Sequence, residues 1–155
     1  MELALNGLHE TEEKMQSKLD ELFQGFYTKH TFNEEQRESL IALHSFCKKI
    51  IGRSCIIHVH TSTLIHYLEH TPHPTYLSFS IPADSAELEK TISDLVHKKL
   101  DSMGKSLSDA QIIYFTSPKN KALQLVDLEN ALHFSDLIWG YYLSDTDTIQ
   151  VHILM

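Results

Sequence analysis

Residues 33–51 carry helix start and stop signals at the two ends of one apolar stripe, and this feature constrains the fold most strongly. Asn33 followed by Gln36 is the pattern of a capping box, in which each side chain bonds the backbone of the other residue. Apolar side chains recur at the helical period, and Gly52 follows as a stop. The segment predicts an amphipathic helix, whose apolar face needs a second layer of structure to cover it.

Two other long segments show the same helical period. Residues 11–26 place apolar side chains on one stripe, with Thr11 as the expected cap. A third helix is predicted from Asp84, with Asp84 and Glu87 as its capping box, and Gly104 should end it. Residues 62–70 favour a shorter helix capped by Ser62. The chain therefore predicts three main helices.

Strands are predicted where apolar and polar residues alternate, or where β-branched and aromatic residues concentrate. The expected strands are 54–60, 75–81, 111–116, 138–143 and 148–154, with residues 122–127 favouring a sixth before a short helix. The last two should form a hairpin around residues 144–147. The C-terminal strand is expected at or near a sheet edge, where another chain can add a strand.

Helical and strand segments are partly segregated along the chain. This order predicts an α+β fold with a mostly antiparallel sheet of five or six strands and three main helices packed on it. A chain of 155 residues without a linker or repeat is expected to form a single α+β domain over residues 1–155.

The charge balance argues against nucleic acid as a partner. The chain has 13 basic and 21 acidic residues, and binding to phosphates needs clustered cations that it lacks.

No apolar run is long enough for a membrane span, and the N-terminus does not resemble a signal peptide. Cys47 and Cys55 do not form a dense disulfide pattern, so we expect a reduced, cytoplasmic protein. Gly104-Lys105-Ser106 lacks the earlier glycine of a phosphate-binding loop, and no cofactor is expected.

The stretch from residue 55 to 76 concentrates histidines and is the main candidate for chemistry. His58 and His60 should share one face of a strand, and His66 and His70 should share one face of a helix. A metal site would require these four side chains to converge on one point. No His-Glu-x-x-His pattern is present, and solvent-facing histidines are the competing interpretation.

Two function classes follow from these features. The first is a non-enzymatic, acidic protein-binding module, such as an immunity-type inhibitor of a toxin or a small chaperone, with a basic partner protein. Its candidate contacts lie on the first helix and near the last hairpin: Glu12, Glu13, Asp20, Tyr141, Tyr142, Asp145 and Asp147. The second is a histidine-dependent metal-binding protein or hydrolase built on residues 58–73. A homo-oligomer paired through residues 149–155 is a further hypothesis for the quaternary structure.

Overall fold

The computed structural model describes residues 2–29, 31–51, 55–82, 84, 86–120, 128 and 137–155, and of residues 2–12 and 29 it describes the backbone only. Its elements, in chain order, are α1 (Glu2–Lys29), α2 (Glu34–Ile50), β1 (Cys55–Ile57), α3 (Thr61–His70), β2 (Tyr76–Pro82), α4 (Leu88–Ser102), the short 3-10 helix η1 (Leu107–Asp109), β3 (Ile112–Pro118), β4 (Ile138–Ser144) and β5 (Thr148–Leu154).

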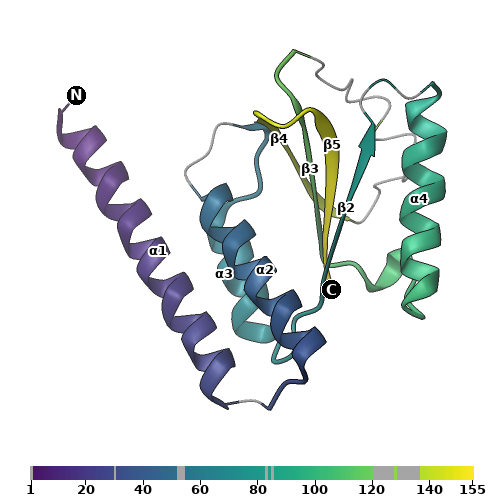
Figure 1. Ribbon diagram of the computed structural model, residues 1–155. Helices are drawn as coiled ribbons and strands as arrows, with labels where there is room; N and C mark the ends of the chain where they lie inside the picture. The colour runs from purple at the N-terminus through teal and green to yellow at the C-terminus, as the bar shows by residue number, and fades with distance from the viewer. Residues whose placement is uncertain are drawn as a thin grey trace. The chain divides into compact units, whose positions relative to one another are not determined.

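The chain divides into two compact units (Figure 1). The helical unit comprises Met1–Arg53 and Val59–Tyr76, and the sheet unit comprises Ser54–His58 and Leu77–Met155. The described residues contain four α-helices and a five-stranded mixed sheet with mostly antiparallel pairing, which confirms the predicted α+β class.

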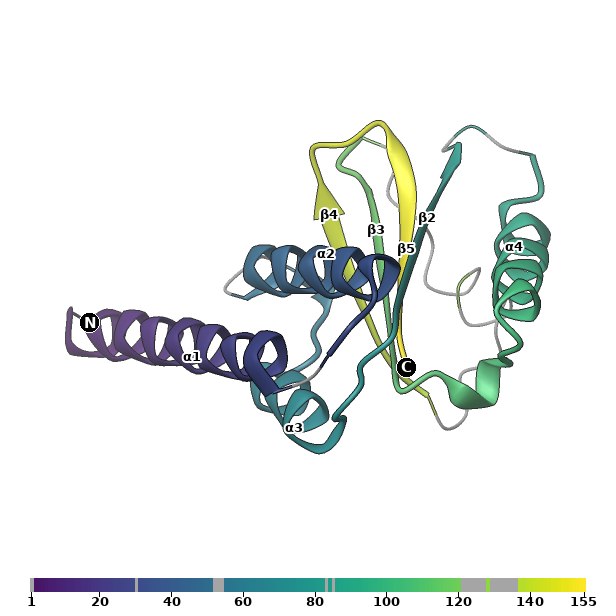
Figure 2. The ribbon, with the colours of Figure 1, turned by 60° about the horizontal axis from the view of Figure 1, so that its bottom comes forward.

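In the helical unit, α1 packs against α2 and α3. The predicted capping box of α2 is confirmed: the Gln36 amide donates to Asn33 Oδ1 at 2.8 Å, and the Asn33 amide donates to Gln36 Oε1 at 3.1 Å. The predicted start of α1 at Thr11 was wrong, because the helix begins at Glu2. Residues 2–10 contain no proline, and six of the nine are good helix formers, so the helix continues through Asn6 and Gly7. Figure 2 shows the N-terminal part of α1 extending beyond α2 and α3.

The histidine-rich stretch forms less strand than expected. β1 ends at Ile57, and His58 to His60 lie outside it, so the predicted strand over 54–60 was too long. α3 starts at Thr61 with His60 in the N-cap position, two residues before the expected cap at Ser62. Because the strand stops early, His58 and His60 do not share a strand face.

The sheet order in the described residues is β1-β4-β3-β5-β2. β3 pairs in parallel with β4 and antiparallel with β5, so it lies between the two strands that were expected to form a hairpin. The hairpin prediction was therefore wrong. Strands separated by one neighbour lie about 10 Å apart, and the four Cα steps from Ser144 to Thr148 can span up to about 14 Å. The short loop is thus long enough to cross the end of β3, where Pro118 is in register with Ser144.

The position of β5 bears on the oligomer hypothesis. β5 has β3 on one side and β2 on the other, so its backbone groups are paired within the sheet. Strand addition needs an unpaired edge. The proposal that residues 149–155 pair with a second copy is therefore not supported by the sheet order, and β1 and β2 are the edges of the described sheet.

One face of the sheet forms the core of the sheet unit with α4, as Figures 1 and 2 both show. The core residues come from α4, the strands and two connecting segments: Ile81, Ile92, Val96, Leu100, Ala110, Ile113, Phe115, Leu128, Tyr141, Ile149, Val151 and Ile153.

Helix α4 begins later than its sequence pattern suggests. The predicted capping box of Asp84 and Glu87 was wrong, because Glu87 has φ 53 and its side chain makes no cap hydrogen bond. The helix therefore begins at Leu88. Its predicted end is confirmed: Gly104 adopts φ 69, and the Lys105 amide donates to the Leu100 carbonyl at 2.9 Å.

The predicted strand at 122–127 and the short helix after it lie outside the described residues.

Candidate functional site

The helical unit has a groove between α1 and α3, here called the α1 groove. It has a volume of about 550 Å³ and is lined by Lys18, Glu21, Leu22, Gly25, Phe26, Leu68, Glu69 and Pro72. A second hollow of about 420 Å³ adjoins it, because Lys18 and Glu21 line both. The groove therefore continues toward the N-terminal part of α1.

The floor of the α1 groove is apolar because the helical period brings α1 side chains toward α3. Phe26 and Leu68 are buried, and Leu22 is half-buried. Gly25 adds room, since a Cβ at this position would meet no atom within 4 Å. A glycine inside a helix costs about 0.5–1 kcal/mol relative to alanine. The structure thus carries a destabilising residue at the point where the groove is open.

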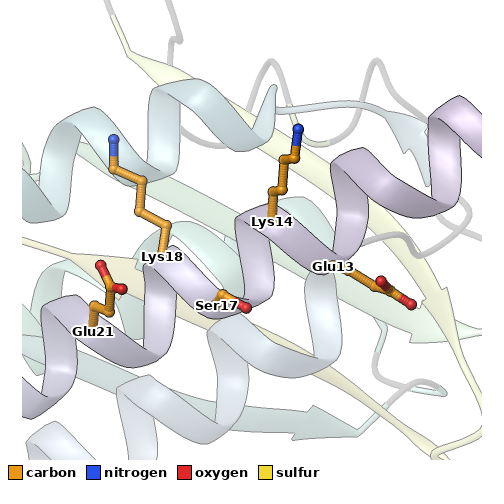
Figure 3. A pocket seen from close by; sticks show the side chains of 5 residues that line it. All are labelled: Glu13, Lys14, Ser17, Lys18 and Glu21. Atoms are coloured by element: carbon orange, nitrogen blue, oxygen red, sulfur yellow. The ribbon is translucent and has the colours of Figure 1, made fainter.

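The rim of the α1 groove is charged. Lys18 Nζ on α1 contacts Glu69 Oε1 on α3 at 2.9 Å. This hydrogen bond is the main reason that the pKa of Glu69 lies below its usual value. Figure 3 shows Lys14 and Lys18 pointing the same way from successive turns of α1, with Glu13 and Glu21 on either side of them. An apolar floor between charged rims is suited to an amphipathic peptide segment.

A second polar cluster joins α1 to α2. Asp20 Oδ1 accepts hydrogen bonds from His44 Nε2 at 3.0 Å and from Lys48 Nζ at 3.1 Å. The His44 hydrogen bond and then that of Lys48 lower the pKa of Asp20. His44 also stacks on Phe23, with ring centroids 4.3 Å apart and planes at 7°. Asp20, one of the predicted partner contacts, is therefore engaged in holding two helices together.

The other predicted contacts are distributed differently. Tyr141 and Tyr142 are 0% and 2% exposed, so neither can contact a partner at the surface, and both leave the candidate surface. Glu13 is exposed and lines the adjoining hollow, whereas the side chain of Glu12 lies outside the described residues.

Two predicted contacts lie in the loop between β4 and β5. Asp145 and Asp147 are exposed, and Asp145 pairs with Lys119 at 3.1 Å. They belong to the sheet unit, so they are no part of the α1 groove in the helical unit.

The four candidate metal ligands are divided between the two units. His58 belongs to the sheet unit, whereas His60, His66 and His70 belong to the helical unit. Across the described part of the chain, no three His, Cys, Asp or Glu side chains are placed to hold one metal ion. The rings of His66 and His70 do come together, with centroids 4.1 Å apart.

A cysteine and a histidine meet in the sheet unit, where Cys55 Sγ lies 3.3 Å from His58 Nδ1. A nucleophilic cysteine needs a lowered pKa so that the thiolate is available. Burial instead raises the pKa of Cys55, and it raises that of the fully buried Cys47 further. This pair therefore lacks the electrostatic signature of an activated thiol.

Two sequence signals point to features that the predictions missed. Gly25 interrupts an otherwise regular amphipathic helix, which marks a place where a side chain is missing. The order His66-Tyr67-Leu68-Glu69-His70 is the reverse of His-Glu-x-x-His, so a search for the forward order does not find it. In one class of zinc peptidases this reversed order supplies two imidazole ligands and a glutamate.

Comparisons with known proteins leave the family open. No family model and no curated protein matches the chain. Among solved structures, a mutant FtsZ from M. jannaschii aligns with a TM-score of 0.47 and 13% identity, over 84% of this chain and 43% of that one. The chain thus spans less than half of that protein's length. Among the helices described, none is long and apolar enough to cross a membrane.

Proposed function

We propose that this chain is a non-enzymatic protein-binding module and that the α1 groove receives an amphipathic, basic segment of its partner. The observation that carries the proposal is the groove itself, where Gly25 leaves room above a floor that includes Phe26 and Leu68. Binding grooves combine an apolar floor for affinity with polar rims for orientation.

The charge of the chain favours a basic partner. Acidic residues outnumber basic ones by 21 to 13. On the described part of the rim, Lys18 is paired with Glu69, which leaves Glu13 and Glu21, beside Lys14, to meet a partner's charges. Complementary charge speeds association and fixes orientation. An inhibitor or chaperone that acts on a basic protein in the cytoplasm is the role that this combination supports best.

The histidine-dependent hydrolase has less support. Its candidate residues are divided between two units, and the thiol nearest to a histidine has a raised pKa. The groove rim is lined mainly by lysines and glutamates, without a nucleophile and base in contact among the residues that the structure describes.

Photo-crosslinking tests for a partner at the α1 groove. A photoreactive amino acid is placed at Ser17, in the hollow that adjoins the α1 groove, and, in a second sample, at Asp94 on the exposed side of α4. Each protein is irradiated in native lysate, and the captured proteins are identified by mass spectrometry. The proposal expects a basic protein captured at Ser17 and absent at Asp94. Capture at Asp94 alone would contradict it.

The captured protein is then purified and its affinity measured with three variants. Gly25→Ala places a methyl group in the groove and should weaken binding about tenfold, equivalent to about 1.4 kcal/mol. Glu21→Lys should weaken a basic partner by a similar factor, and Asp94→Lys serves as the matched control. Unchanged affinity in Gly25→Ala would exclude the groove, and tighter binding by Glu21→Lys would exclude a basic segment.

A further inference from the structure

The C-terminal turn of α3 presents two imidazoles side by side at the surface. His66 and His70 are both exposed, their ring centroids are 4.1 Å apart, and their planes meet at 34°. They are four residues apart, and the helical period places such residues on one face. The buried side chains of α3 lie on its other side: Leu64, Ile65, Tyr67 and Leu68.

A hydrogen bond fixes the tautomer of the second ring. His70 Nδ1 donates to the His66 carbonyl at 2.9 Å, so this nitrogen carries the proton. The neutral ring then has its lone pair on Nε2. Metal-binding histidines use this arrangement, in which the nitrogen that does not bind the ion donates to a carbonyl or a carboxylate.

The surroundings of this pair favour a cation. His70 lies in the last turn of α3, where the helix dipole is negative. Glu69 precedes His70 in the helix, and its carboxylate contacts Lys18 Nζ at 2.9 Å. A divalent ion bound to the two rings would therefore have the carboxylate of Glu69 close by.

The distance between the two rings is close to the distance expected for two imidazoles that bind the same ion. Two imidazoles bound to one ion at about 2.0–2.1 Å, at an angle near that of a tetrahedron, have centroids about 5 Å apart. The observed 4.1 Å is shorter by about one ångström. Rotation of two exposed side chains can open this distance, since neither ring is packed in the core.

From these contacts we infer that His66 and His70 form a two-histidine site for a borderline divalent metal ion such as Zn²⁺ or Ni²⁺, with water completing the coordination. Imidazole ligands suit these ions rather than Mg²⁺ or Ca²⁺. The site is independent of the proposed protein-binding function. It lacks a third protein ligand among the described residues, so the His-x-x-Glu-His order supports ion binding here and no hydrolytic step.

Calorimetric titration of the tag-free protein with ZnCl₂, and separately with NiCl₂, tests the site. One ion per chain is expected. His66→Ala and His70→Ala should each weaken binding at least about tenfold. The double variant should be no weaker than either single one, because removing one ligand already breaks the chelate.

The matched control is the double variant His58→Ala/His60→Ala, which removes two exposed histidines outside the pair. It should bind the ion as the unchanged protein does. Equal losses of affinity for the ion in both double variants would show that many histidines share the binding, and this would overturn the site. Unchanged affinity in His66→Ala would also overturn it. Circular dichroism at 222 nm on the same samples shows that α3 is retained, so loss of binding is not loss of the helix.

Discussion

Asp20→Asn is the substitution that best tests how α1 is held on α2. One carboxylate oxygen, Asp20 Oδ1, accepts from both His44 and Lys48, at 3.0 and 3.1 Å. Asparagine keeps the size and an oxygen acceptor but removes the negative charge. The substitution therefore measures the electrostatic part of this contact with little change in packing.

The loss of stability expected for Asp20→Asn is small because Asp20, His44 and Lys48 form an exposed cluster. The Asp20 side chain is 51% exposed, so solvent screens both contacts strongly. Exposed ion pairs contribute about 0–1 kcal/mol each, and we expect a total loss of about 1 kcal/mol. With a urea m-value of about 2 kcal/mol/M for a chain of this size, the unfolding midpoint should fall by about 0.5 M.

The pH dependence has a definite sign. The pKa of Asp20 is lowered from its ordinary value of 3.8, so the folded state binds this proton more weakly than the unfolded state. The stabilisation by ionised Asp20 is complete above the pKa that this group has in the unfolded state. It is lost as the pH falls through the pKa that the group has in the folded state. The difference between the original protein and Asp20→Asn should be full at about pH 5 and should shrink at about pH 3.

Urea unfolding followed at 222 nm provides the measurement, with Glu21→Gln as the control. Glu21 is the next residue along α1, is exposed, and makes no ion pair with the residues that the structure describes. The control midpoint should stay within about 0.2 M of the original. Equal midpoints for the two variants at neutral pH would refute the reasoning, and so would a difference that grows from about pH 5 to about pH 3.

Three further outcomes test the sheet unit and the thiols. Ser117→Ala should lower stability by about 1–2 kcal/mol in thermal unfolding, because it removes the hydrogen-bond partner of the buried Tyr141 hydroxyl; an unchanged melting temperature would contradict this. Thr116→Val should leave stability unchanged or raise it by up to about 1 kcal/mol, since the buried Thr116 hydroxyl finds no hydrogen-bond partner among the described residues; a clear loss would show a partner. Iodoacetamide should label Cys55 in the native protein, and faster at alkaline pH because burial raises its pKa, while Cys47 should react only after unfolding; equal labelling rates would show that Cys47 is accessible.

The sequence predicted the elements of this fold better than their pairing. The Asn33–Gln36 box acts within one turn and was confirmed, whereas the Asp84–Glu87 pattern of the same kind did not form a capping box. The insertion of β3 between β4 and β5 depends on which strand best fills the sheet centre. All seven residues of β3 are buried, which suits a central strand, but no local pattern shows that a short loop skips over it.

The prediction that Tyr141 and Tyr142 lie at the surface was wrong for a related reason. Tyr141 and Tyr142 were both proposed as partner contacts, although alternation along a strand places them on opposite faces. β4 is covered on both faces at these positions, and both rings are buried. Exposure on α1 was predicted correctly at Glu13 and Asp20, because a helix with one covered side leaves the other in solvent.

The positions of some histidines follow from a single helix, whereas the positions of others depend on how separate segments fold. His66 and His70 belong to one helix, so their sequence spacing was enough to bring the rings together. His58 and His60 depended on a strand that ends at Ile57, and without that strand they have no common face. A site of four converging rings required both segments to be regular and to face one another. What the chain retains is one pair on one helix, and any affinity for an ion in this stretch should therefore depend on His66 and His70 and not on the number of histidines.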